Sequence, residues 1–301
     1  MGIPGALVQL ARDFQEAGVR LYGVGGMVRN PRLGLPISDM DITSALRPER
    51  VLALCQGKGY GVVKKGLAFG MVEIHLGGYA FEHTTFRADT YGPGGGHRPT
   101  AIAFSDTVEA DAFRRDFTVN ALYQDLLTGT VLDPTGGLKD LAAKRLRATS
   151  PDPAVILRDD ALRVLRLARF CGELGFEPEP GTFGAAQRFV GGLKDISRER
   201  VRDELQKILL ADGKYGNQAG VYQGLHLLDR LGALEVILPA LAAGRGLGQR
   251  QEYHAYDVLE HGLQTAAQAE LAGGLELRLG ALLHDVGKPA AFQATGRMLH
   301  H

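Results

Sequence analysis

The sequence predicts an α+β fold in which a small mixed sheet, with a few helices packed on it, precedes an all-helical remainder. The pattern changes near residue 140. Before that point, short β-branched and aromatic runs lie between turn residues, which is typical of strands. After it, segments rich in Leu and Ala repeat their apolar residues with the helical period. At 301 residues the chain is long enough for two or more domains.

The predicted strands span residues 19 to 24, 37 to 43, 60 to 64, 69 to 76 and 78 to 86. The predicted helices span residues 158 to 174, 198 to 210, 218 to 230, 255 to 271 and 275 to 284. Pro151 and Pro153 stand just ahead of the first of these helices, where proline is tolerated. Ser197 is expected to cap the second helix.

The composition is that of an ordinary soluble globular protein, with 45% hydrophobic and 23% charged residues. No apolar run reaches the ~18 residues that a membrane span needs, and the N-terminus lacks a signal-peptide pattern. Cys55 and Cys171 are isolated in apolar surroundings. We therefore expect two buried thiols in a cytoplasmic protein without a membrane partner.

The first candidate site follows the predicted strand at residues 19 to 24, which runs directly into Gly25 and Gly26. Two glycines let the backbone approach a phosphate closely, and the N–H groups that open a helix favour anions. Arg29, in the first turn of that helix, adds a fixed fork of donors for phosphate oxygens. The segment is therefore predicted to bind phosphate.

Asp39 and Asp41 form the candidate metal site. On a strand, residues i and i+2 point to the same face and can hold one or two divalent cations between them. Two aspartates in such a stretch can equally belong to a turn or cap a helix. The phosphate-binding segment just before them favours the metal site.

Charge is balanced over the whole chain, with 34 basic and 34 acidic residues. Its distribution is uneven, because residues 139 to 169 carry eight basic and four acidic side chains, a net charge of +4. A solvated helix face is the ordinary explanation of such a run. The alternative is a surface for a triphosphate or a nucleic-acid end.

Five motifs follow one another along nearly the whole chain: Gly25-Gly26-Met27-Val28-Arg29, Asp39-Met40-Asp41, the run from Arg114 to Leu122, the run from Asp133 to Leu141, and the run from Arg158 to Arg166. In this order they resemble the class II tRNA nucleotidyltransferase and poly(A) polymerase family. Two positions depart from the family pattern. Asp159 replaces the usual Glu and keeps the charge, whereas Asn30 replaces the usual Asp and loses it.

The resemblance implies a polymerase-β-like nucleotidyltransferase head at residues 1 to 140. It further implies a helical neck at 141 to 210 that binds the base and triphosphate, a helical body at 211 to 248 that binds RNA, and an incomplete HD domain at 249 to 301. The implied reaction is addition of C, A or both to the 3′ end of tRNA from CTP and ATP, with Mg²⁺ and release of pyrophosphate.

The implied site residues carry over position by position. Glu82, which points to one face of its predicted strand with small neighbours around it, is similar to the family's third catalytic carboxylate beside Asp39 and Asp41, although an isolated Glu on a strand is often only a solvated edge residue. The implied nucleotide contacts are Gly25, Gly26, Arg29, Arg115, Asp116, Asn120, Asp160, Arg163, Arg166 and Arg169. Residues 88 to 99, with four glycines and two prolines, are expected to form a flexible lid.

Base choice is predicted from Asp160 and Arg163, which an uninterrupted helix would present side by side as an acceptor and a donor. Cytosine and adenine both offer an amino donor beside a ring-nitrogen acceptor. The pair therefore fits C and A and leaves unpaired groups against G and U. The alternative is an intrahelical salt bridge worth ~0.3 kcal/mol.

Two other functions remain open. A poly(A) polymerase of the same family would use ATP alone. An HD-type phosphohydrolase would use His254, His261, His284 and Asp285, which look like the start of a metal site. That site needs a further distal Asp, so we do not expect a working phosphohydrolase. The oligomeric state is left open by the sequence.

Overall fold

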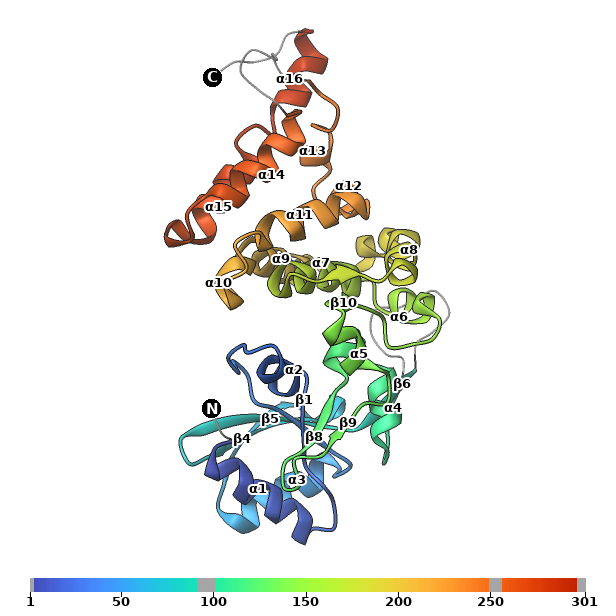
Figure 1. Ribbon diagram of the computed structural model, residues 1–301, viewed down its shortest axis with the longest axis vertical. Coiled ribbons are helices and arrows are strands. Elements are labelled where there is room, and N and C mark those ends of the chain that lie inside the picture. Colours follow the sequence, from blue (N-terminus) through green and yellow to red (C-terminus); the bar gives the residue numbers. More distant parts are fainter. Residues whose placement is uncertain (1–2, 91–100, 249–255, 297–301) are drawn as a thin grey trace. The chain divides into compact units, whose positions relative to one another are not determined.

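The structure is a computed structural model and describes residues 3 to 90, 101 to 248 and 256 to 296. Its chain divides into two compact units, Met1–Ile156 and Leu157–His301 (Figure 1). Most of the predicted lid, from residue 91 to 99, lies outside the described residues, and so does His254. The four-part division expected from the sequence stays a prediction.

The first unit is built on a seven-stranded mixed sheet with the strand order β3-β4-β5-β2-β1-β8-β9. Its strands are β1 (Tyr22–Val24), β2 (Asp41–Ser44), β3 (Gly61–Gly66), β4 (Met71–Leu76), β5 (Tyr79–Thr85), β8 (Tyr123–Asp125) and β9 (Val131–Leu132). The strand β2 pairs with β5 in parallel, and the other neighbours are antiparallel. All five strands predicted from the sequence are present, although β1 and β2 are shorter than expected.

One face of this sheet is covered by α1 (Gly5–Glu16) and α3 (Pro48–Lys58), which lie below it in Figure 1. Phe14 of α1 and Val51 of α3 pack with Ile42 and Phe81 of the sheet in one buried core. The alternation along β5 follows from this contact, because Phe81, His83 and Thr85 are buried while Glu82 and Thr84 on the other face are only half-buried.

The remaining elements of the first unit are short. The helices are α2 (Gly26–Arg32), α4 (Val108–Phe113) and α5 (Gly137–Ala142), with 3₁₀ turns at Leu67–Phe69 and Thr118–Asn120. The strands β6 (Arg87–Thr90) and β7 (Ala101–Phe104) form a separate antiparallel pair, and β10 spans Arg145–Leu146. Asp133 accepts hydrogen bonds from the backbone N–H of Gly137 at 2.7 Å and of Leu138 at 2.9 Å, which fixes the start of α5.

A fully buried carboxylate, Asp111 of α4, holds together a polar cluster inside the first unit. It accepts hydrogen bonds from Arg114 at 2.8 Å, from Arg115 at 2.9 Å and from the hydroxyl of Tyr123 at 2.7 Å. Burial alone would raise the pKa of Asp111, but the charges of the two arginines and these hydrogen bonds outweigh it and lower the pKa to about 2. The cluster ties α4 to β8.

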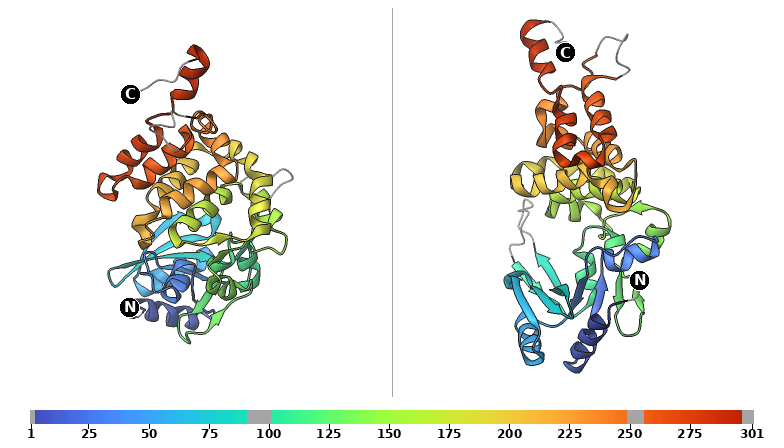
Figure 2. Two further views of the ribbon diagram at one scale, coloured as in Figure 1. Left: turned by 45° about the horizontal axis from the view of Figure 1, so that its top comes forward. Right: turned by 90° about the vertical axis from the view of Figure 1, so that its left-hand side faces the viewer.

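The second unit, yellow-green to red in Figure 2, consists almost entirely of helices. Its helices are α7 (Leu162–Leu174), α8 (Pro180–Phe189), α9 (Arg198–Leu209), α10 (Ala211–Tyr215), α11 (Gly220–Arg230), α12 (Ala233–Ile237), α13 (Pro239–Ala242), α14 (Val258–Gln268), α15 (Gly274–Leu283) and α16 (Lys288–Thr295). Its other elements are β11 (Glu177–Pro178) and 3₁₀ turns at Val190–Asp195 and Leu271–Gly273. Ser197 caps α9 as predicted, accepting from the N–H of Arg200 at 3.5 Å.

The long helix predicted from residue 158 is interrupted. A short helix, α6 (Pro153–Asp159), ends before Asp160, and α7 begins only at Leu162. The backbone N–H of Leu162 bonds instead to the Asp160 carboxylate at 3.1 Å. An aspartate competes in this way for the free N–H groups of a helix start, so the expectation of one continuous helix was wrong.

Both cysteines are buried thiols, as expected. Cys55 packs in the core of the first unit, where burial raises its pKa to about 11, and burial also raises the pKa of Cys171 in α7. Across the helices of the described ranges, none combines the length and the apolar character that crossing a membrane requires.

A glycine contact holds two helices of the second unit close together. A Cβ at Gly172 of α7 would lie 2.5 Å from the carbonyl oxygen of Gly220, at the start of α11. We predict that Gly172→Ala lowers the free energy of unfolding by about 1–3 kcal/mol, because backbone rather than a flexible side chain must move. Urea denaturation followed by circular dichroism measures this.

The matched control is Gly184→Ala in α8, where a new Cβ meets nothing within 4 Å. This change should raise stability by up to about 1 kcal/mol, since alanine is the better helix former. Equal effects of the two substitutions would contradict the close approach of α7 and α11.

Part of the free energy of unfolding should depend on pH through Asp111. Its folded pKa of about 2 lies below the ordinary value of 3.8, so its contribution is complete above pH ~4 and is lost as the pH falls toward 2. We predict that Asp111→Asn destabilises the protein at pH 7 by about 3 kcal/mol. Between pH 5 and pH 2 the wild-type protein should lose about 2 kcal/mol of stability through this carboxylate, and the Asp111→Asn variant should not show that loss. Urea titrations at these pH values test this, with the exposed Asp106 changed to Asn as control, and an unchanged pH dependence would refute it.

Candidate active site

The candidate catalytic carboxylates meet where β2 and β5 run in parallel. Asp41, the first residue of β2, lies directly opposite Glu82 of β5. Directly paired residues project from the same face of a sheet, and this face is the one that α1 and α3 leave uncovered. Asp39 is exposed and precedes the strand by two residues, with the hydroxyl of Ser38 donating to its carboxylate at 2.8 Å.

The predicted phosphate-binding glycine adjoins this pair. Gly25 has a φ of +64°, and a Cβ built on it would lie 3.7 Å from the Oδ2 atom of Asp41. The start of α2 therefore lies next to the carboxylate, and the positive φ at Gly25 is what favours glycine there. The sequence predicted both features separately, and the structure brings them together.

The donor set suits a hard divalent cation, because Mg²⁺ prefers carboxylate oxygens and keeps several waters. The three carboxylates are not gathered as tightly as in a finished site: within the described ranges, the groups of three ligand atoms lying within 4.8 Å of one another do not include Asp39, Asp41 and Glu82. Glu82 instead lies 3.8 Å from the ammonium of Lys65. The residues fit a cation in their chemistry. Asp41 and Glu82 share a face of the sheet, whereas Asp39 precedes β2, so the expectation that Asp39 and Asp41 lie on one strand was wrong.

Arg29 is held inside the first unit by amides. Only 3% of it is exposed, and its guanidinium donates to Asn120 and, at 2.9 Å, to Asn30. Asn120 in turn donates to Asp116 at 3.1 Å. Asn30 and Asn120 are neutral amides, so these hydrogen bonds orient the guanidinium.

Asn30 is a residue whose role the sequence left open. Its carbonyl oxygen accepts from Arg29, and its amide donates to the backbone oxygen of Pro36 at 2.8 Å. It therefore orients the arginine and fixes the segment that leads to Asp39. An aspartate could not make the second bond, because it has no amide donor.

Arg115 lies in a different cluster from the other predicted nucleotide contacts of the first unit. Asp116 and Asn120 join Arg29, although the segment between them is a 3₁₀ turn rather than the helix considered from the sequence. Arg115 bonds to Asp111 and to Tyr123. The side chains of Arg115 and Asp116, although adjacent in the sequence, thus belong to different hydrogen-bonded clusters.

In the second unit, Asp160 is held away from the helix face on which it was expected. One carboxylate oxygen caps α7 at Leu162, and the other accepts from Arg200 of α9 at 2.8 Å. Arg163 lies on α7 and is 8% exposed. The continuous helix assumed for Asp160 and Arg163 is therefore absent, because Asp160 precedes α7, and the role of the pair in base choice stays a prediction.

Arg169 is a buried structural residue in this arrangement. It donates to Glu204 at 2.6 Å and to Glu173 at 3.1 Å, and its guanidinium lies 4.0 Å from the centre of the Phe170 ring. Burial would raise the pKa of Glu204, but the charges of Arg169 and Arg166 outweigh it and lower the pKa. The sequence predicts that both Arg166 and Arg169 are available to a triphosphate, whereas Arg169 is buried and Arg166 has a third of its side chain exposed.

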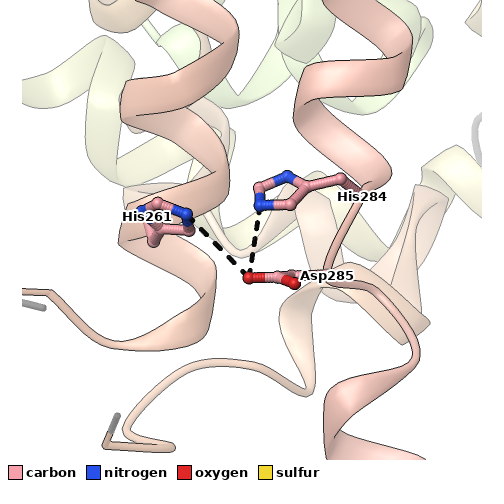
Figure 3. Close-up of side chains that lie close together, drawn as sticks. All are labelled: His261, His284 and Asp285. Carbon is pink, nitrogen blue, oxygen red and sulfur yellow. Dashed lines mark ion pairs between the residues drawn. The ribbon is translucent and has the colours of Figure 1, made fainter. Parts of the chain in front are cut away.

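A second cluster lies near the end of the chain (Figure 3). His261 of α14 and His284 after α15 lie 3.9 Å and 3.3 Å from one Asp285 oxygen. Lys288 donates to the same oxygen at 2.8 Å. Burial would raise the pKa of Asp285, but the bond from Lys288 helps to lower it. The structure assembles three of the four residues predicted from the sequence, with a lysine already beside them.

Two family models, both of polymerase A proteins, match segments of this chain. Residues 21–147 match the family model "Poly A polymerase head domain", and residues 175–244 match "Probable RNA and SrmB- binding site of polymerase A". The CCA-adding enzyme of Limosilactobacillus fermentum is 36% identical over 269 residues, which is 89% of this chain and 61% of that protein. The CCA-adding enzyme of Bacillus pumilus is 35% identical over 281 residues, or 93% and 63%.

This chain therefore spans about three fifths of the length of these curated relatives. Among solved structures, the Bacillus stearothermophilus CCA-adding enzyme in complex with CTP matches with a TM-score of 0.67 and 28% identity. That match covers 97% of this chain and 70% of the other. The resemblance inferred from the motifs is confirmed: the chain belongs to the tRNA nucleotidyltransferase and poly(A) polymerase family.

Proposed function

We propose that this chain carries the nucleotide-adding part of an enzyme that adds C and A to the 3′ end of tRNA, with CTP and ATP as substrates. The observation that carries the proposal is the register of Asp41 opposite Glu82, beside Gly25. Further support comes from the relatives, which are CCA-adding enzymes, one of them in complex with CTP.

In the proposed reaction the 3′-hydroxyl of the RNA attacks the α-phosphate of the nucleotide. The bond from that phosphorus to the bridging oxygen breaks, and pyrophosphate leaves with the bond electrons. Asp39 and Asp41 would hold Mg²⁺, which activates the hydroxyl and neutralises phosphate charge when bound. Glu82 would complete the carboxylate set, and the buried charge of Arg29 would attract the triphosphate.

Base selection is proposed for Asp160 and Arg163 in a form that the observed bonds permit. A carboxylate has about four lone-pair sites, so Asp160 can accept an amino hydrogen from C or A while it still caps α7 and pairs with Arg200. Arg163 would donate to the neighbouring ring nitrogen. G and U would instead place a carbonyl oxygen against Asp160 and a ring N–H against Arg163. Neither contact is a hydrogen bond, and unpaired polar groups of this kind let a site reject analogues.

A poly(A) polymerase would share the same chemistry and differ in using ATP alone. The phosphohydrolase alternative has one observation in its favour, the cluster of His261, His284 and Asp285. Against it, Lys288 already bonds to the carboxylate oxygen that both histidines approach. We therefore favour the transferase, and we place it in the cytoplasm because both thiols are buried and reduced.

The assay supplies tRNA that lacks its terminal CCA, Mg²⁺ and each labelled nucleotide in turn. We expect incorporation of C and then A. Long A tracts would indicate the poly(A) polymerase, and phosphoester hydrolysis without incorporation would indicate the phosphohydrolase.

Asp41→Ala should lower incorporation by about 10³-fold, since it removes a carboxylate proposed to hold the metal. Binding of the tRNA, measured by filter retention, should change little. Asp106→Ala, which removes an exposed carboxylate of the same unit, should keep full activity. Activity that survives Asp41→Ala would refute the metal assignment.

Arg200→Ala should leave the carboxylate of Asp160, the proposed base-reading residue, less firmly positioned. The bond from Arg200 to Asp160 is partly exposed, so we expect it to contribute only about 1 kcal/mol, which is about fivefold. The KM for CTP and ATP should rise by that factor, and discrimination against UTP should fall. Arg202→Ala, which removes a more exposed arginine from the same helix, is the control. Unchanged discrimination in Arg200→Ala would argue against Asp160 as a base-reading residue.

A further inference from the structure

Three carboxylates form a row across the sheet at the candidate active site. Glu73 of β4 lies directly opposite Glu82 of β5, and Glu82 lies directly opposite Asp41 of β2. All three therefore project from the same face of adjacent strands. Like charges at directly opposite positions repel one another, so this row needs a compensating positive charge.

Lys65 supplies a positive charge at one end of the row. Its ammonium forms an ion pair with Glu73 and lies 3.8 Å from Glu82, while His75 contacts the other oxygen of Glu73 at 2.9 Å. The register of β3 against β4 shifts between Val63 and Gly66, so Lys65 lies in a bulge. Bulges commonly re-aim a side chain beside an active site.

Stability alone does not account for this arrangement. The side chain of Lys65 is 42% exposed, and exposed ion pairs contribute only about 0–1 kcal/mol. The location of the Lys65 ammonium matters more than the energy of its ion pairs, because it competes with a cation for the Glu82 carboxylate. One lysine thus bridges a carboxylate of the proposed site, Glu82, and one outside it, Glu73.

We propose that Lys65 is a positioning residue that sets how tightly the Asp41–Glu82 pair binds a divalent cation. With no cation bound, Lys65 lies between Glu73 and Glu82 and offsets one of the three negative charges of the row. A bound cation repels the ammonium from Glu82, and Glu73 retains it. The inference rests on the proposed function only in taking Asp41 and Glu82 as the cation-binding carboxylates.

The charge of Lys65 should therefore weaken cation binding. Two positive charges on an ion and one on an ammonium, ~6 Å apart in water, repel enough to change affinity about tenfold at low salt. Lys65→Met should tighten binding by that factor. Lys65→Arg keeps the charge and should retain the wild-type affinity, and Lys65→Met combined with Glu73→Gln should return it toward wild type.

The test titrates the protein with Mn²⁺ alone and measures free Mn²⁺ by electron paramagnetic resonance, without nucleotide or RNA. Asp41→Ala identifies the binding that belongs to this site. Lys64→Met is the matched control, because it removes one lysine charge from the adjacent residue of the same strand. Its affinity should stay within about twofold of wild type, as expected for a charge more distant from the row.

The inference is supported if Lys65→Met, but not Lys64→Met, binds Mn²⁺ several times more tightly. It is overturned if Lys65→Met binds like wild type, if both lysine variants shift equally, or if no binding depends on Asp41. The titration needs no turnover, so a protein that incorporates no nucleotide would refute the proposed function while leaving this result readable.

Discussion

The parallel pairing of β2 with β5 is the constraint on which the rest of the site depends. Parallel neighbours cannot be joined by a tight turn, and here the connection passes through α3, β3 and β4. That route places Asp41 opposite Glu82 and brings Glu73 alongside. A slip of one residue would turn the carboxylates into the apolar core, so the packing of Ile42 and Phe81 under α1 and α3 fixes the register of the catalytic face.

Around this face, the polar groups of the first unit divide into two clusters with different duties. Asp111, Arg115 and Tyr123 form a cluster around the fully buried Asp111 carboxylate, which accepts hydrogen bonds from the guanidinium and the hydroxyl. Arg29 is bonded to the neutral amides Asn30 and Asn120. These amides orient a buried guanidinium that we propose for triphosphate binding, whereas the Asp111 cluster links α4 to β8 within the fold.

Much of the fold was predictable from local patterns, because apolar residues recur with the strand period before residue 140 and with the helical period after it. The interruption at Asp160 was not, since helix period alone cannot show that a carboxylate will bond the backbone of Leu162. The fate of Arg169 was equally hidden. Its partner Glu204 is distant in sequence, and only the packing of α7 against α9 brings them together. The role of Lys65 depends on a bulge, which strand propensity does not report.

The central claim is that a divalent cation binds at Asp39 and Asp41 with Glu82 on the same face. A crystal structure with Mn²⁺ and a non-hydrolysable CTP analogue, with anomalous scattering used to place manganese, tests it most directly. We predict an anomalous peak within ~2.5 Å of carboxylate oxygens of Asp39 and Asp41, a usual ligand distance for such cations. A peak found only at His261 and His284, with none at the aspartates, would contradict it.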